Sequence, residues 1–222
     1  MSKIIFYSNT NSNGKNDATG AFVPEAKAFA KYYGVPPENV VGVNCKLPPI
    51  QRRKAVIKKL KQAKDFEVLM FFGHGWPDGI QFGFNRANID ELASAIDFVD
   101  GMKIGIFACL TAENDTRDNN IDGLGVATDG GFADKLRDVL NVEYGWTGWV
   151  DAHKTAGHAT WNPYVVRFKA GQHLGGQWII TPGTDLWKHW VRALANNDDD
   201  MRYRFFTMFG DDIKVELSPS SD

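Results

Sequence analysis

The chain has few cysteines and no long apolar run. Cys45 and Cys109 are the only cysteines among 222 residues, which argues against a scaffold stapled by disulfides and makes a reducing compartment the expected environment. No segment approaches the roughly 20 consecutive apolar residues of a membrane helix, and the apolar run after Lys3 is too short for the core of a signal peptide. We therefore expect a cytoplasmic protein that does not associate with a membrane.

The chain also lacks an excess of charge of either sign. It carries 25 lysines and arginines against 27 aspartates and glutamates, for a net charge of −2, so no strong field favours nucleic acid or an anionic surface. The basic segment 52–64, RRKAVIKKLKQAK, has no aromatic residues between its charges. That pattern indicates a solvated helix face, and we expect no nucleic-acid partner.

What the chain does have is the length and apolar content of one domain. Hydrophobic residues make up 43% of the chain, which at this length is enough for a single core. We expect one domain over 1–222, with its core in about 1–196 and a C-terminal extension in 197–222. No internal repeat or shift in composition marks a second domain.

Segments typical of strands and helices alternate with short connections. This order predicts an α/β domain with a mostly parallel sheet and helices on both faces. The expected strands are 3–9, 39–45, 66–72, 103–109, 142–150 and 177–183, with a short hairpin in 79–84; the expected helices are 24–34, 49–64, 88–99, 130–141 and 185–196.

Two of the expected strands end in small residues around a reactive side chain. VLMFFGHG runs into His74 between two glycines, and IGIFAC runs into Cys109. Parallel sheets carry their functional groups just beyond the carboxyl ends of the strands. If these strands are neighbours, the imidazole and the thiol lie at one edge of the sheet, within reach of one substrate.

An imidazole and a thiol at one edge suit attack on an amide. The thiol must lose its proton to become a nucleophile, and the departing amine must gain one. An imidazole titrates near neutral pH and can perform both transfers. The main-chain N–H groups of Gly75 and Cys109 are candidate donors for the oxyanion, and we expect the glycines beside His74 to expose it and to leave room for substrate.

These motifs resemble the signature of the caspase–hemoglobinase clan (clan CD) of cysteine peptidases, in which one apolar strand ends in His-Gly and a later one in Ala-Cys. The resemblance implies a caspase-like three-layer αβα sandwich, a His74–Cys109 dyad, an oxyanion hole from the amides of Gly75 and Cys109, a protein or peptide substrate, and no required cofactor. Caspases carry Gln-Ala-Cys followed by Arg, Gln or Gly and then Gly, about 50 residues after the histidine. The chain has IFACLTAEN after a shorter separation, so it is not a true caspase.

The segment 179–187, IITPGTDLW, is similar to the late substrate-binding loop of the same clan. The likeness implies that Thr184 and Asp185 line the pocket for the residue before the scissile bond. An acidic Asp185 there would favour a lysine or arginine in the substrate. The alternative is an ordinary exposed acid in a loop.

An acidic loop in 118–129 matches the first half of a calcium-binding loop. Asp118, Asn120 and Asp122 occupy the ligand positions of the pattern, and Asp129 stands at the twelfth position, where a glutamate normally binds. Ca²⁺ therefore stays open as a ligand. The alternatives are a substrate-binding or self-cleavage loop and a plain solvated loop.

The remaining candidates leave two other functions open. His153 and His158 have no evident third metal ligand and are expected to serve structure or substrate positioning, or to compete with His74 as the base. Cys45 is expected to be a buried or loop thiol. A catalytically inactive caspase-like binding module and a Ca²⁺-responsive α/β domain remain the alternatives to a peptidase, and the sequence predicts no oligomeric state.

Overall fold

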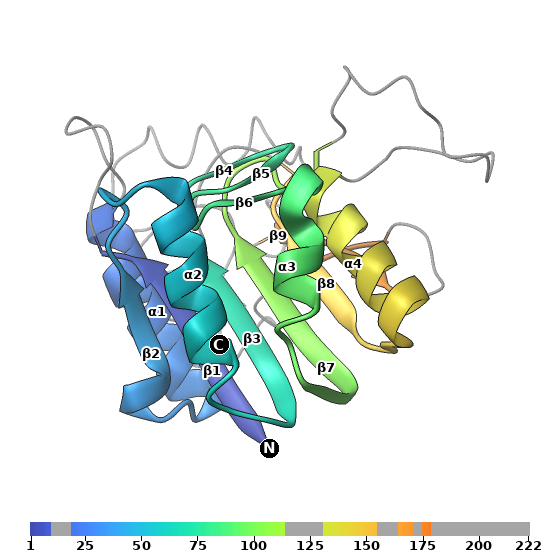
Figure 1. The fold of residues 1–222 in the computed structure, drawn as a ribbon, viewed down its shortest axis with the longest axis horizontal. Helices are drawn as coiled ribbons and strands as arrows, with labels where there is room; N and C mark the ends of the chain where they lie inside the picture. Colours follow the sequence, from blue (N-terminus) through green and yellow to red (C-terminus); the bar gives the residue numbers. More distant parts are fainter. Residues whose placement is uncertain (10–18, 114–130, 155–163, 171–174, 179–222) are drawn as a thin grey trace, which may run out of the picture.

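The structure is a computed structural model that describes residues 1–9, 19–113, 131–154, 164–170 and 175–178. Its centre is a seven-stranded sheet in the order β10-β9-β8-β7-β3-β1-β2 (Figure 1). The five strands from β8 to β2 run parallel, and β9 and β10 are antiparallel to their neighbours. The strands are β1 (Ser2–Ser8), β2 (Val40–Val43), β3 (Phe66–Phe72), β7 (Phe98–Phe107), β8 (Trp149–Ala152), β9 (Tyr164–Lys169) and β10 (Gly175–Trp178).

In the described part of the chain, four α-helices pack on this sheet. On one face, α1 contributes Phe22 and Phe29 to a buried cluster with Phe72 of β3. The other three helices contribute to a larger cluster on the opposite face, together with strand residues such as Phe71, which is next to Phe72 in β3 and points the other way. Figure 1 shows α2 and α3 in front of the sheet. The expected α/β fold with a mostly parallel sheet is confirmed. The helices are α1 (Thr19–Tyr33), α2 (Pro49–Leu60), α3 (Ile89–Ala93) and α4 (Gly131–Tyr144).

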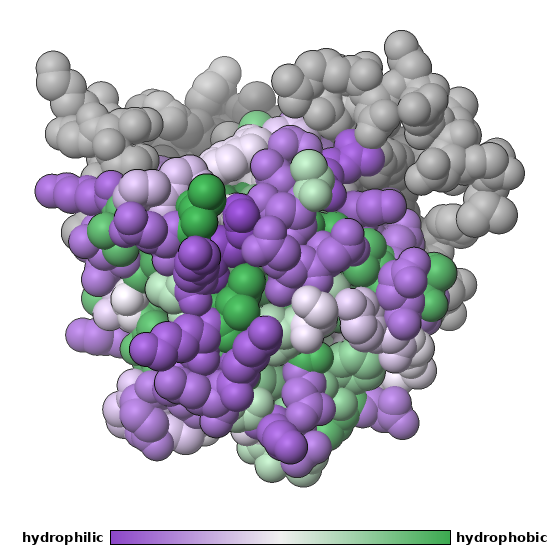
Figure 2. Space-filling model, in the orientation of Figure 1, coloured by the Kyte–Doolittle hydropathy of each residue, from purple (hydrophilic) through white to green (hydrophobic). Residues whose placement is uncertain are grey.

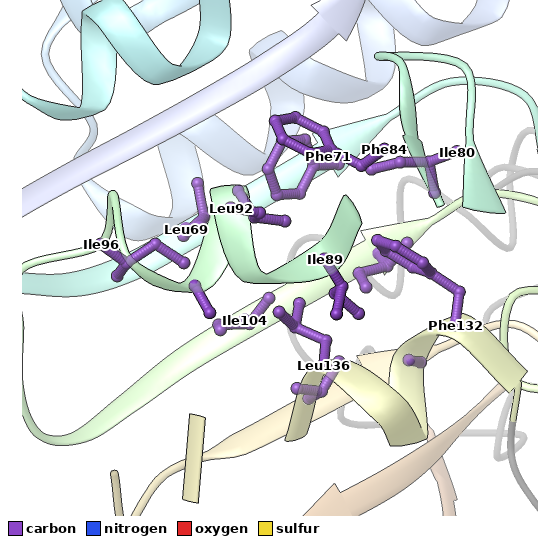
Figure 3. Close-up of a cluster of buried hydrophobic side chains, with 14 of the residues drawn as sticks. Leu69, Phe71, Ile80, Phe84, Ile89, Leu92, Ile96, Ile104, Phe132 and Leu136 are labelled. Carbon is purple, nitrogen blue, oxygen red and sulfur yellow. The ribbon is translucent and has the colours of Figure 1, made fainter. Parts of the chain in front are cut away.

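The larger cluster joins α3, α4 and the sheet. Figure 3 shows Ile89 of α3 beside Phe132 and Leu136 of α4, in one cluster with the strand residues Leu69 and Ile104. All three helix side chains are at most 1% exposed. Full burial of each large apolar side chain stabilises the fold by about 1.5–3 kcal/mol, so this contact fixes α4 against the rest of the domain.

Helix α2 has the two faces that its sequence predicts. Val56 and Leu60 are buried, whereas Lys54 and Lys58 are exposed. Hydrophilic residues cover much of the surface on the side where α2 and α3 lie (Figure 2). Lys54 and Lys58 therefore meet solvent, whereas Arg53 of the same helix pairs with Glu91.

Several expected boundaries were wrong. The helix expected over 88–99 ends at Ala93, because Phe98 already pairs with Phe66 in the sheet. The strand expected over 142–150 begins only at Trp149, because α4 continues to Tyr144 and Gly145 ends it with a φ of 70°. Sheet pairing and helix continuation thus overrode local preferences.

Other boundaries moved in the same way. Helix α1 begins five residues earlier than expected and holds Pro24 inside it. Strand β7 ends at Phe107, so Cys109 lies in a turn beyond the strand. Strand β9 was not expected, although its sequence YVVRFK alternates as strands do. The segment expected as helix 185–196 and the extension 197–222 lie outside the described residues.

A second, small sheet follows β3. It has the order β4-β5-β6 and consists of β4 (Gly75–Trp76), β5 (Gly79–Ile80) and β6 (Phe84–Asn85). The expected hairpin in 79–84 is thus part of a three-stranded antiparallel unit. In the described part of the chain, no helix is long and apolar enough to cross a membrane.

Candidate active site

The histidine and the cysteine singled out by the sequence follow neighbouring strands. β3 and β7 pair in parallel, and Phe72 opposite Phe107 is the last pair in register. The Gly73 N–H donates to the Phe107 carbonyl at 3.4 Å. His74 and Cys109 each lie two residues beyond that last pair. The carboxyl ends of parallel strands share one edge of a sheet, so both residues belong to the same edge.

Gly75 lies directly against the turn that carries Cys109. A Cβ on Gly75 would lie 2.9 Å from the Cys109 carbonyl oxygen. It would also lie 2.6 Å from Thr111 Cγ2 and 2.7 Å from Ala108 Cβ. A side chain does not fit at these distances, so only glycine permits the approach. The main chain after His74 therefore contacts the turn around Cys109.

The turn around Cys109 holds a strained residue. Leu110 has a φ of 61°, in the left-handed region that costs a non-glycine residue about 1–2 kcal/mol. The Thr111 hydroxyl donates to the Ala108 carbonyl at 3.0 Å, and the Glu113 N–H donates to the Leu110 carbonyl at 2.9 Å. Strain of this kind persists only where neighbouring contacts impose it, and it gathers at functional sites.

His74 is held through its main chain and packs on α1. Its N–H donates to Gln81 Oε1 at 3.1 Å, and its carbonyl accepts the Gln81 N–H at 2.9 Å. Its ring meets the edge of Phe22, with 5.2 Å between ring centroids. A Cβ on Gly73 would lie 3.0 Å from the Phe82 ring and 3.4 Å from Gln81 Oε1. The glycines around His74 thus have a packing role that the sequence interpretation did not include.

The first turn of α4 ties the two post-strand loops together. The Phe132 N–H donates to the Pro77 carbonyl at 2.8 Å, and the Ala133 N–H donates to the Thr111 carbonyl at 3.0 Å. The first N–H groups of a helix have no partner inside the helix. Gly131 has a φ of 66°, and a Cβ there would lie 2.8 Å from the Pro77 carbonyl oxygen. Helix α4 therefore fixes the spacing of the loops that carry His74 and Cys109.

His153 belongs to the interior behind the cysteine turn. It follows β8, is 0% exposed, and its carbonyl accepts the Ala112 N–H at 2.9 Å. Its ring lies 5.9 Å from that of Phe107. This placement favours the structural role among those that the sequence left open.

A second polar group lies where β8 and β9 pair. Arg167 contacts both carboxylate oxygens of Asp151 at 2.7 Å and stacks over the Trp149 ring at 4.4 Å from its centroid. Burial raises the pKa of Asp151 above its usual range, although Arg167 opposes the shift. Burial, and then the nearby Asp151 charge, raise the pKa of Tyr33 to about 12.

The remaining candidates are the second cysteine and the predicted metal and pocket residues. Cys45 is buried in the core at 1% exposure, and neither cysteine forms a disulfide. Within the described ranges, no group of three or more His, Cys, Asp or Glu side chains is arranged to hold a metal ion. The predicted residues outside the described ranges are Asp118, Asn120, Asp122, Asp129, His158, Thr184 and Asp185.

Sequence reasoning missed two parts of this edge. The first is Gln81, whose signal was a polar residue inside the otherwise apolar run GIQFGF. The second is the role of the first turn of α4 in joining the two loops; the helix itself was expected over 130–141 and begins at Gly131. Neither signal names its contact. Gln81 bonds His74 only once the chain folds back on itself within seven residues, and α4 bonds Pro77 and Thr111 from a segment that is remote in sequence.

No family model, no curated protein and no solved structure matches the chain.

Proposed function

We propose that the chain is a cysteine endopeptidase with a caspase-like three-layer αβα sandwich. The sheet order, with its parallel centre and helices on both faces, supports this fold. The His-Gly and Ala-Cys motifs at the ends of β3 and β7 support the activity. The proposal takes a protein or peptide as substrate and needs no cofactor.

In the proposed reaction, His74 takes the thiol proton of Cys109, and the thiolate sulfur attacks the carbonyl carbon of the scissile bond. The main-chain N–H groups of Gly75 and Cys109 stabilise the oxyanion; one such donor typically contributes about 3 kcal/mol. As the C–N bond breaks, the His74 imidazolium gives its proton to the leaving amine. Water then hydrolyses the thioester and regenerates the thiol.

One observation carries the proposal. Gly75 contacts the Cys109 turn so closely that a methyl group would not fit between them. Two oxyanion donors must lie within a few ångströms of each other and of the nucleophile, because both bind one oxygen. The Gly75–Cys109 contact joins the two main-chain segments that would supply those donors.

Part of the proposed substrate site is described. Trp76 follows Gly75 directly and is 42% exposed, so its ring offers an apolar surface to a bound peptide beside the site. Asp185 and Thr184 remain the proposed pocket for the residue before the cut. An acidic pocket would select lysine or arginine there.

The proposal is tested by peptide cleavage and by labelling with a thiol-reactive peptide probe. Cys109→Ala is expected to abolish both, because the nucleophile is lost. Cys45→Ala is the matched control, since Cys45 is a buried cysteine that follows β2, two strands away from β3 in the sheet, and it should retain both. Cleavage by Cys109→Ala at the wild-type rate would contradict the proposal, and a folded wild type that neither cleaves nor is labelled would favour the inactive binding module.

A further inference from the structure

Gln81 is a polar residue in an apolar turn. It lies between β5 and β6, where Ile80 and Phe82 are 0% exposed and Phe84 is 1% exposed. Gln81 itself is 3% exposed. Burying a carboxamide costs free energy unless its groups are hydrogen-bonded, so a glutamine here needs a reason beyond packing.

The carboxamide of Gln81 hydrogen-bonds the main chain of His74. Its Oε1 accepts the His74 N–H, and the opposite orientation would set two donors against each other. Its Nε2 is buried and has no hydrogen-bond partner among the residues that the structure describes. An unpaired buried donor costs about 1–3 kcal/mol, which a methionine of similar shape would avoid. The contact with His74 is what glutamine provides and methionine does not.

The turn that carries Gln81 is itself anchored. The Gly83 carbonyl accepts a hydrogen bond from Arg53 Nη1 at 2.9 Å, and Arg53 pairs with Glu91 at 2.8 Å. Ile80 and Phe84, on either side of the turn, belong to the buried cluster in Figure 3. Gln81 therefore holds His74 from a platform that is fixed to α2, α3 and the core.

We propose that Gln81 is the positioning residue for His74, an inference that rests on the proposed function. Its carboxamide binds the peptide N–H before the His74 Cα, and its main chain binds the carbonyl after it. These two bonds fix the backbone from which the imidazole projects. The next residue, Gly75, is the one in contact with the Cys109 turn, so a shift of this backbone moves the imidazole relative to the thiol.

The first test measures the contact without any activity. Hydrogen exchange of the His74 amide is expected to be at least about tenfold faster in Gln81→Met, because the acceptor oxygen is lost. Gln81→Glu keeps an acceptor oxygen and should stay near the wild type. Gln62→Met makes the same chemical change at an exposed position and should change nothing. Gln81→Asn, which withdraws the oxygen by one methylene, replaces Gln81→Met if that variant does not fold.

The second test separates positioning of His74 from general stability. A peptide amide needs a proton on its leaving amine, whereas an activated ester does not. Gln81→Met is expected to lower kcat for the amide by roughly 10- to 100-fold, since a misplacement of about 1 Å can cost that much. KM should stay unchanged, the ester should lose less, and Gln81→Glu should recover part of the amide activity.

The outcomes distinguish this proposal from the proposed function. Unchanged exchange at His74 would overturn the positioning role, and so would faster exchange with an unchanged amide-to-ester ratio in an active enzyme. If the wild type cleaves nothing, the proposed function fails. The positioning role is then decided by the NMR resonances of the His74 imidazole, which should move in Gln81→Met; resonances that stay in place overturn it.

Discussion

Two regions of the same sheet handle buried polar groups differently. At the β8–β9 pair, Asp151 and Arg167 satisfy each other through their side chains. At the ends of β3 and β7, Gln81 hydrogen-bonds the main-chain N–H and carbonyl of His74. A backbone that is fixed through its own N–H and carbonyl groups presents its side chain in a set direction.

The difference between the β8–β9 pair and the ends of β3 and β7 shows where the structure requires small residues. The β8–β9 pair is held by contacts between the side chains of Asp151, Arg167 and Trp149. The edge at β3 and β7 depends on main chains that approach within the space of a methyl group, as at Gly75 and Gly131. Preorganised main-chain donors are what acyl transfer needs, and such donors tolerate little displacement.

The largest expected effect comes from closing that space. Gly75→Ala should push the turns of His74 and Cys109 apart and lower peptide cleavage by about 100-fold or more. Overpacking should also cost roughly 1–3 kcal/mol in the free energy of unfolding. Steady-state kinetics and urea unfolding measure the two effects.

The matched control for this change is Gly101→Ala. Gly101 has a φ of 75° but open space around the position of a Cβ, so alanine there strains the backbone without touching the edge. It should lose stability while its activity per folded molecule stays at the wild-type level. Equal activity losses in the two variants would remove the distinction between the edge and the rest of the fold.

A smaller effect is expected at the β8–β9 pair. Asp151→Asn keeps the shape of the side chain and removes its charge. Because the cost of burying that charge and its pairing with Arg167 act in opposite directions, the free energy of unfolding at neutral pH should change by less than the roughly 3–5 kcal/mol lost when a buried pair loses one partner. Peptide cleavage per folded molecule should be unchanged, because the pair lies outside the site. Asp97→Asn, at an exposed position, is the control.

The pH dependence of this variant has a defined sign. Burial raises the pKa of Asp151 in the folded chain above its usual 3.8, so the folded state keeps the proton longer than the unfolded state. The contribution of Asp151 to stability is therefore complete below pH 3.8 and is lost as pH rises through the raised value. The wild type should lose stability relative to Asp151→Asn as pH rises from below 3.8 to 7. A relative gain would show that the Arg167 pair outweighs burial.

The sequence predicted the parts of the fold that depend on local pattern. The apolar run 66–72 gave a buried strand at its expected bounds, and Gly34 ends α1 with a φ of 64°. The pairing of β3 with β7 did not follow from the pattern. The sequence places His74 and Cys109 within reach of one substrate only if these two strands are neighbours, and the structure shows that they are.

The rest depended on contacts that the local sequence pattern does not show. Phe98 lies in β7 and not in the expected helix, because it pairs with Phe66 on the neighbouring strand β3. Gln81 looked like part of a simple hairpin, and its bond to His74 arises only when the turn folds back on β3. The loops that hold Asp118 and Asp185 lie outside the described residues, so the Ca²⁺ and pocket predictions stay predictions.

The central claim is that His74 and Cys109 act on one substrate at the shared edge. The most direct measurement compares peptide-amide and activated-ester turnover in the wild type, His74→Ala and Cys109→Ala. Cys109→Ala should lose both reactions, and His74→Ala should lose roughly 10²–10⁴-fold on the amide but clearly less on the ester, which needs no proton on its leaving group. Equal losses on both substrates, or full amide turnover without His74, would contradict the account.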